Sequence, residues 1–144
     1  MIKILVPIDG SDHSDRIISQ LLKTVALYKE TVELHVLNVQ PPVPYSNKVS
    51  HAIGHEQVEK YLQEEGEHAL KTSLATLAAA GAAYKKHIVK GDPVEVILRT
   101  ARDNDCSQIF MGTHGRGAVK GLLLGSVASK VAHLSTIPVT LVRQ

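Results

Sequence analysis

The sequence predicts an α/β fold, an open parallel sheet of five strands with helices on both faces. Short apolar, β-branched segments alternate with longer segments whose apolar residues recur at helical spacing. Strands that alternate with helices need crossover connections, which place helices over both faces of a parallel sheet. The length of 144 residues suits one domain. We therefore expect a single domain over residues 1–144 with the strand order 3-2-1-4-5.

The first half of the chain supplies two strands and two helices. Residues 2–8, IKILVPI, are short, apolar and bounded by DGSD, as expected of a buried strand. Residues 13–29 carry one helical stripe of apolar residues, and Ser11 or Asp12 can cap this helix. A second strand is expected over 32–39, VELHVLNV. The proline-rich segment 40–55 is predicted to be a loop, and a long helix over 56–80 is predicted to end at Gly81.

The second half supplies three strands and two helices. Strands are expected over residues 84–89, 107–112 and 137–142. Between the first two, GDPVE starts a helix that ends near DND, with Asp92 as N-cap, Pro93 at the first helical position and Glu95 completing a capping box. SVASKVAHL, residues 126–134, is predicted to form the last, short helix.

Composition excludes several classes of protein. The net charge is +2 with acidic and basic residues interspersed, and aromatic residues make up 3% of the chain, so neither a basic stripe nor a stacking platform for nucleic acid is expected. Cys106 is the only cysteine, which excludes an internal disulfide and fits a reducing compartment. No segment approaches the ~20 apolar residues that cross a bilayer. We expect a cytoplasmic protein that binds neither nucleic acid nor membrane.

The segment GTHGRGAVKGLLLGS, residues 112–126, holds five of the ten glycines. It follows the fourth strand, and PIDGSD follows the first, so the order 3-2-1-4-5 places both at the switch point where open α/β sheets bind ligands. The segment ends at a helix start, where unpaired N–H groups favour anions. Arg116 and Lys120 add positive charge, and His114 can donate a hydrogen bond. These features predict a cradle for a nucleotide or polyphosphate.

The glycine spacing excludes two common cradles. A P-loop needs Gly-Lys-Ser/Thr, and here Lys120 precedes Gly121. A dinucleotide fingerprint does not fit either, because the loop comes too late in the chain for an acidic ribose ligand about 20 residues on. The spacing that is present, Gly112-x2-Gly115-x9-Gly125-Ser126, resembles the motif G-x2-G-x9-G-[S/T] of the ATP-binding universal stress proteins. The opening ILVPIDGSDHS, the segment LHVLNV and the ending GTHGRGAVKGLLLGSVASKVAHLSTIPVTLV resemble the same family.

This resemblance implies a Rossmann-like fold that binds ATP, with AMP or cyclic AMP as alternatives. Asp9 would lie near adenine and ribose or help to hold Mg²⁺, and the backbone at Val39 would contact adenine. The nucleotide-binding residues implied in full are Pro7, Ile8, Asp9, Val39, Met111, Gly112, His114, Gly115, Arg116, Gly125, Ser126 and Val127. Gly121 departs from the basic or polar residue that many members carry there, which would weaken contacts to phosphate.

The resemblance also implies a homodimer through the last strand, residues 137–142, and a regulatory role in stress survival. Two alternatives stay open: slow ATP hydrolysis or autophosphorylation with Ser126 as phosphate acceptor, and an interaction protein that binds no nucleotide. No dedicated general base is apparent, so fast turnover is not expected.

Each residue also has a purely structural interpretation. Asp9 can simply form a turn, and Ser126 can simply cap a helix. The pair His51 and His55 is interpreted as part of a solvated loop rather than as metal ligands, because no third ligand is evident. Cys106 is interpreted as structural, since no base or basic cluster accompanies it.

Overall fold

The computed structural model describes residues 1–42, 54–115 and 123–143. Its five strands form one parallel sheet in the order β3-β2-β1-β4-β5. The strands are β1 (Ile2–Pro7), β2 (Val32–Gln40), β3 (Ala83–Lys90), β4 (Gln108–Gly112) and β5 (Val139–Val142). The predicted fold class and strand order are confirmed.

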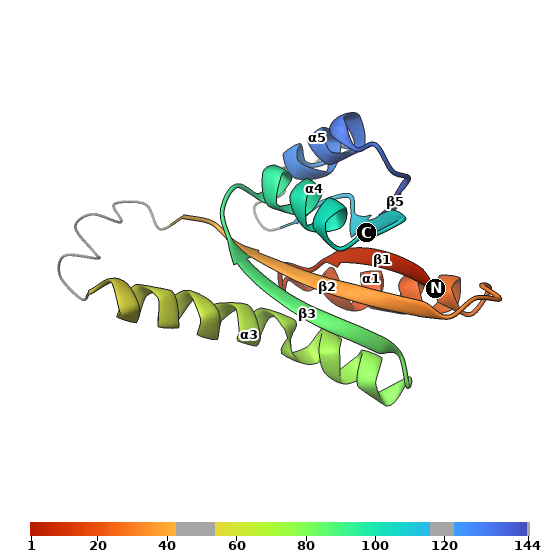
Figure 1. Ribbon diagram of the computed structural model, residues 1–144, viewed down its shortest axis with the longest axis horizontal. Coiled ribbons are helices and arrows are strands. Elements are labelled where there is room, and N and C mark those ends of the chain that lie inside the picture. Colours follow the sequence, from red (N-terminus) through yellow and green to blue (C-terminus); the bar gives the residue numbers. More distant parts are fainter. Residues whose placement is uncertain (43–53, 116–122, 144) are drawn as a thin grey trace.

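Two helices cover each face of the sheet (Figure 1). The helices are α1 (Ser14–Val25), α3 (His55–Ala79), α4 (Pro93–Asp103) and α5 (Ser126–Leu134). Alternate residues of β1 and β2 point to opposite faces: Ile4 and Leu34 pack with α1 and α3, whereas Leu5 and Leu37 pack with α4 and α5. Both faces of the central strands are buried, as a parallel sheet requires.

The helix ends show which local predictions were right. Asp92 accepts a hydrogen bond from the Glu95 amide at 3.1 Å and caps α4 as predicted. Gly81 follows the end of α3 with φ of +73°, a conformation that glycine adopts without strain. Neither Ser11 nor Asp12 caps α1, because the N-cap is His13 and no side chain bonds there. Turn residues 8–12 are instead held by the bonds described below.

The register places the carboxyl ends of three strands side by side. β1 pairs with β2 from Ile2↔Val32 to Pro7↔Leu37, and on its other side it pairs with β4. The turn after β1, the end of β2 and the loop after β4 therefore share one edge of the sheet. We call this edge, residues 8–11, 38–39, 112–115 and 125–127, the carboxyl edge.

Candidate functional site

The turn after β1 and the loop after β4 meet at Asp9 and Gly115. A Cβ added to Gly115 would lie 2.7 Å from Asp9 Oδ2, so the two loops touch. The other carboxylate oxygen, Oδ1, accepts a hydrogen bond from the Ser11 amide at 2.9 Å. Two candidate residues more than a hundred positions apart in the sequence are thereby brought together.

The start of α5 is joined to the same loop by backbone hydrogen bonds. Thr113 donates from its amide to the Val142 carbonyl at 3.0 Å, and its carbonyl accepts from the Gly125 amide at 2.7 Å. Gly125 is the N-cap of α5, and Ser126 is its first residue, with no side-chain capping bond. The interpretation of Ser126 as an N-cap was wrong by one residue. The exposed Ser126 and the unpaired first-turn amides are thus available to an anion.

The motif glycines have reasons for being glycine that do not involve a ligand. A Cβ on Gly112 would lie 2.9 Å from Ile17 Cδ1, and one on Gly125 would lie 3.2 Å from the Thr113 carbonyl oxygen. With the contact of Gly115 on Asp9, all three positions are tight against the protein itself. A side chain at any of these positions would therefore make its neighbour shift, whether or not a phosphate also approaches.

Several predicted site residues belong to the hydrophobic core through their side chains. Ile8 packs beneath α1, Val39 and Met111 pack beneath α4 and α5, and Val127, on α5, packs against the same core. Only the main chain of such residues can reach a ligand at this edge. Pro7 is the last residue of β1. The predicted residue Arg116, together with Lys120 and Gly121, lies outside the described residues.

Sequence reasoning missed Asn38, a buried residue near the end of β2 whose side chain binds the main chain of the turn after β1. Its side chain is 2% exposed, and its Nδ2 donates to the Ile8 carbonyl at 2.9 Å. Its Oδ1 accepts from Gln40 Nε2 at 2.6 Å. A single amide within the apolar run LHVLNV was the available signal, because a polar group buried in a strand needs specific partners.

Two hydroxyls were missed as well. Among the described residues, Ser11 Oγ and Ser14 Oγ are buried and have no hydrogen-bond partner. Ser14 is the first residue of α1, and Ser11 follows the Asp9 turn. Buried hydroxyls without partners are uncommon in proteins and are satisfied by water or by a ligand.

Comparisons with known proteins agree with this geometry. A model of the universal stress protein family matches residues 1–143. The chain is 31% identical over 148 residues to the universal stress protein YxiE of Bacillus subtilis, with 98% of each chain covered. It is 33% identical over 146 residues to a universal stress protein of Thermus aquaticus, with 97% of each covered. The chain belongs to the universal stress protein family.

Solved structures share the fold. The structure of MJ0577, named in Methanocaldococcus jannaschii as a universal stress protein, matches with a TM-score of 0.83 at 28% identity, covering 99% of this chain and 96% of that one. A universal stress protein solved in complex with cAMP matches with a TM-score of 0.61 at 25% identity, covering 99% and 96%. A family protein from Arabidopsis thaliana with AMP bound has a TM-score of 0.66 and covers 100% and 92%, and at 17% identity it shows the shared fold alone.

The described residues leave little open space at the carboxyl edge of this family member. The cavity there has a volume of about 10 Å³, which is too small for one water molecule. It is lined by His13, Arg16, Ile17, Gly112, His114, Val142 and Arg143.

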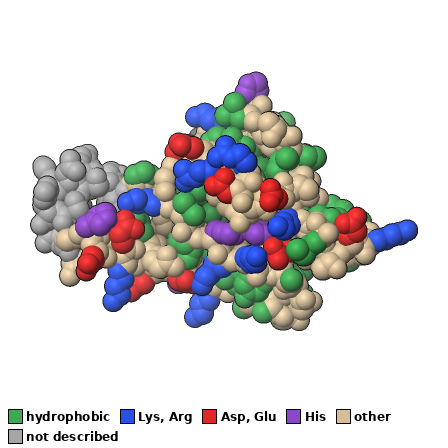
Figure 2. Space-filling view, in the orientation of Figure 1, with side chains coloured by type: hydrophobic (Ala, Val, Ile, Leu, Met, Phe, Trp, Pro, Cys, Tyr) green, Lys and Arg blue, Asp and Glu red, His purple; other side chains and the backbone are tan. Residues whose placement is uncertain are grey.

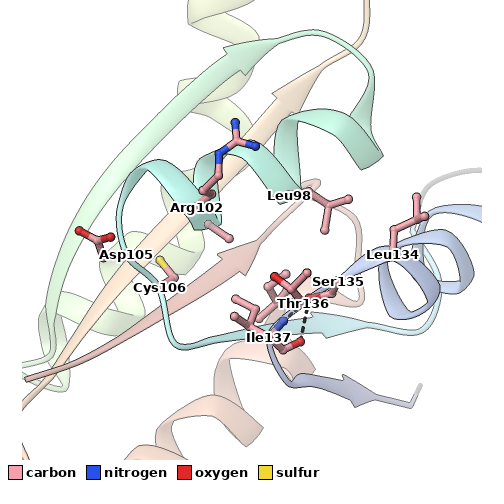
Figure 3. Close-up of a pocket in the computed structure, with 10 residues that line it drawn as sticks. Leu98, Arg102, Asp105, Cys106, Leu134, Ser135, Thr136 and Ile137 are labelled. Carbon is pink, nitrogen blue, oxygen red and sulfur yellow. Dashed lines mark hydrogen bonds between the residues drawn. The ribbon is translucent and has the colours of Figure 1, made fainter.

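A larger groove lies at the opposite end of the strands, between α4 and α5 (Figure 3). It has a volume of about 580 Å³ and is lined by Leu98, Ala101, Arg102, Asp105, Cys106, Ile109 and residues 134–137. We call it the α4–α5 groove. Burial raises the pKa of the Cys106 thiol to about 11, so the thiol stays protonated at neutral pH. The interpretation of Cys106 as structural agrees with this.

A histidine pair links β2 to β3, on the sheet face that α4 partly covers. His35, 2% exposed, has Nε2 2.8 Å from Glu33 Oε1 and Nδ1 2.9 Å from His87 Nε2. With both rings neutral, His87 donates to His35 and His35 donates to Glu33. The bond from His35, with help from Lys85, lowers the pKa of the Glu33 carboxyl. Burial, with the charges of His35 and Lys85, lowers the pKa of His87.

The histidine pair is not a metal site. Glu33 and His87 bind opposite nitrogens of His35, so the three groups do not converge on one point. Across residues 1–42, 54–115 and 123–143, no three His, Cys, Asp or Glu side chains are placed to hold a metal ion. His55 is the first residue of α3 and not part of a loop as predicted, and its Nε2 lies 3.8 Å from Glu59 Oε1. His51 and most of the predicted loop over 40–55 lie outside the described residues.

Charged side chains of both signs lie on the surface of the described residues. On the face seen in Figure 2, basic side chains of the described residues are interspersed with acidic ones. None of the described helices is both long enough and apolar enough to cross a membrane.

Proposed function

We propose that the chain binds an adenine nucleotide at the carboxyl edge, with ATP and Mg²⁺ as the physiological ligand. The observation that carries this proposal is the meeting of the Asp9 turn, the Gly115 loop and the N-terminus of α5 at one edge of the sheet. The relative solved in complex with cAMP supports an adenine ligand. Among the described residues, the buried hydroxyls of Ser11 and Ser14 have no hydrogen-bond partner and are suited to bind a polar ligand near the Asp9 turn.

Each part of the edge suits one part of the nucleotide. The backbone at Val39 offers amide and carbonyl groups to the adenine edge. The amides of Ser126 and Val127 sit at the positive end of α5 and suit the phosphates, while the Gly125 amide is bound to the Thr113 carbonyl. Mg²⁺ is commonly held by one or two carboxylates together with substrate phosphates, so Asp9 alone is a sufficient protein ligand. Pro7, Ile8, Met111 and Gly112 shape the site, His114 is expected to face the phosphates, and Arg116, outside the described residues, would add positive charge.

The wider role that we propose is regulatory. Residues 1–144 act as one domain in the cytoplasm, and nucleotide occupancy changes the conformation of the loops around Asp9 and Gly115. β5 is the last strand of the sheet, and its Val139 and Leu141 are only half-buried. An edge strand of this kind needs cover, which a second copy pairing through residues 137–142 would supply.

A thermal-shift and calorimetry panel tests the proposal. ATP, ADP, AMP and cyclic AMP are titrated with and without Mg²⁺, and a ligand at 100 times its Kd stabilises by about 2.7 kcal/mol. Ser126→Ala weakens phosphate binding, whereas Ser129→Ala, an exposed serine one turn later in α5, leaves it unchanged. Asp9→Asn removes the benefit of Mg²⁺. If no nucleotide shifts the melting temperature of the wild-type chain, the proposal is wrong.

A further inference from the structure

We propose that Asn38 is a positioning residue for the nucleotide site, because it sets the orientation of the Asp9 turn. This inference rests on the proposed function. Asn38 acts through the main chain of Ile8, which directly precedes Asp9.

The contact falls where the pairing of β1 with β2 stops. The last paired residues are Pro7 and Leu37, and the Ile8 amide donates to the Leu37 carbonyl at 2.8 Å. The Ile8 carbonyl is then taken by the Asn38 side chain at 2.9 Å. Both polar groups of the Ile8 main chain are therefore tied to β2, one by backbone and one by a side chain.

The rigidity of the peptide group carries this restraint to Asp9. The Ile8 carbonyl and the Asp9 amide belong to one planar unit, so fixing the oxygen also fixes the direction of the Asp9 N–H. Gly10, the next residue, has φ of +80°, and a Cβ there would lie 2.8 Å from Ala69 of α3. The turn is thus held on one side by Asn38 and on the other by α3. Its carboxylate can then meet both the Ser11 amide and Gly115.

The orientation of the Asn38 amide is itself determined. Gln40 Nε2 donates to Asn38 Oδ1 at 2.6 Å, and Asn38 Nδ2 donates to the Ile8 carbonyl. If the Asn38 amide were flipped, its NH₂ group would face the NH₂ group of Gln40, and its oxygen would face the Ile8 carbonyl oxygen. The Gln40 carbonyl in turn accepts from the Gly91 amide at 3.0 Å. Asn38 is therefore part of a buried network, in which losing one donor affects the group that remains.

Asn38→Asp tests this role with a change of one group. It keeps the acceptor for Gln40 but replaces the donor that holds the Ile8 carbonyl. The matched control is Asn104→Asp. Asn104 directly follows α4, and its Nδ2 also donates to a main-chain carbonyl, that of Thr100, at 2.9 Å. Both variants are compared with the wild-type chain for nucleotide Kd, denaturation midpoint and amide chemical shifts.

At pH 7.5 we expect Asn38→Asp to weaken ATP binding about tenfold, since a buried acceptor has lost its donor. Asn104→Asp changes the Kd less than about twofold, although it too loses a hydrogen bond. Relative to the wild-type chain at the same pH, the Asn38→Asp affinity recovers on acidification, because a protonated carboxyl donates to the Ile8 carbonyl again. Gln40→Leu, a milder change at the outer end of the network, weakens binding about threefold and serves if Asn38→Asp does not fold.

The outcomes separate this inference from the proposed function. If the wild-type chain binds ATP and Asn38→Asp or Gln40→Leu binds it equally well, the positioning role is wrong. If the wild-type chain binds no nucleotide, the proposed function fails. The amide chemical shifts of Asp9, Gly10 and Ser11 then still decide whether Asn38 positions the turn. If it does, these shifts change in Asn38→Asp and stay unchanged in Asn104→Asp.

Discussion

Two regions of the molecule differ in how their polar groups are satisfied. One is the carboxyl edge, and the other is the sheet face under α4, which holds the histidine pair and Cys106. On the α4 face the reactive-looking side chains are engaged with one another or with the core: both nitrogens of His35 are bonded, and the Cys106 thiol is buried and protonated. At the carboxyl edge and the adjoining start of α1, the described residues include a helix N-terminus without a side-chain cap and two buried serine hydroxyls without hydrogen-bond partners. The ligand site is therefore expected where the main chain is open to a ligand.

The comparison shows that shifted pKa values do not identify the site in this protein. Perturbed groups often cluster at functional sites. Among the described residues, the groups with a shifted pKa owe the shift mainly to a local hydrogen bond or to burial within the fold: Glu33, Glu59, Glu67, His87 and Cys106. The α4–α5 groove is also the larger cavity, yet its lining is mainly apolar. The smaller cavity lies at the edge that carries the family motif.

The largest effect is expected from His35→Ala. The substitution leaves a cavity and removes the partner of both Glu33 and His87, and we expect a loss of about 3 kcal/mol in the free energy of unfolding. Urea denaturation measures it, with the exposed His133→Ala as control. Nucleotide affinity stays within twofold of wild type, since the histidine pair is separate from the carboxyl edge. A loss below about 1 kcal/mol would show that the pair contributes little.

Cys106 is expected to be nearly inert in the native state. A pKa of about 11 leaves about 100-fold less thiolate at pH 8 than the ordinary value of 9.0 would. A thiol reagent therefore reacts at least 100-fold more slowly with the folded chain than with the same chain in urea, as followed by mass spectrometry. Equal rates would mean that the α4–α5 groove exposes a reactive thiol.

Acid is expected to weaken the link between β2 and β3. The folded-state pKa of His87 is below its unfolded value, so its contribution is complete above about pH 6.5 and is lost as the pH falls through the folded pKa. Glu33, whose folded pKa is also lowered, loses its contribution at lower pH still. Urea denaturation between pH 8 and pH 5 measures the first step. His87→Gln, which keeps a donor, reduces the slope, and an unchanged slope would exclude His87 as its source.

The smallest change in stability is expected from Gly115→Ala. Its Cβ meets the end of the Asp9 side chain, which can move aside, so the free energy of unfolding falls by less than about 1 kcal/mol. The displaced Asp9 weakens nucleotide binding more than stability. Gly81→Ala is the control, because its Cβ meets nothing within 4 Å and its cost comes from φ of +73° alone. Unchanged affinity in Gly115→Ala would show that the Asp9 contact is not needed.

Much of this fold followed from the sequence because its signals are local. Alternating apolar segments predicted all five strands, and Asp92 and Gly81 marked helix ends through their own backbone chemistry. The Asn38 bond to Ile8 and the tight contacts of the motif glycines depend on which segments lie side by side, so no local pattern contains them. The missing cap on α1 has the same cause, because the amide of Ser11 is already bound to Asp9 and tertiary contacts hold the turn.

The most direct test of the nucleotide site is an amide chemical-shift map of the chain during titration with Mg²⁺-ATP. We predict saturable shifts at Asp9, Val39, Gly115, Gly125 and Ser126, and none at His87, Cys106 or Ser135. That result would place the ligand at the carboxyl edge, away from both the histidine pair and the α4–α5 groove. Shifts confined to the groove, or no shifts at millimolar ATP, would contradict the account.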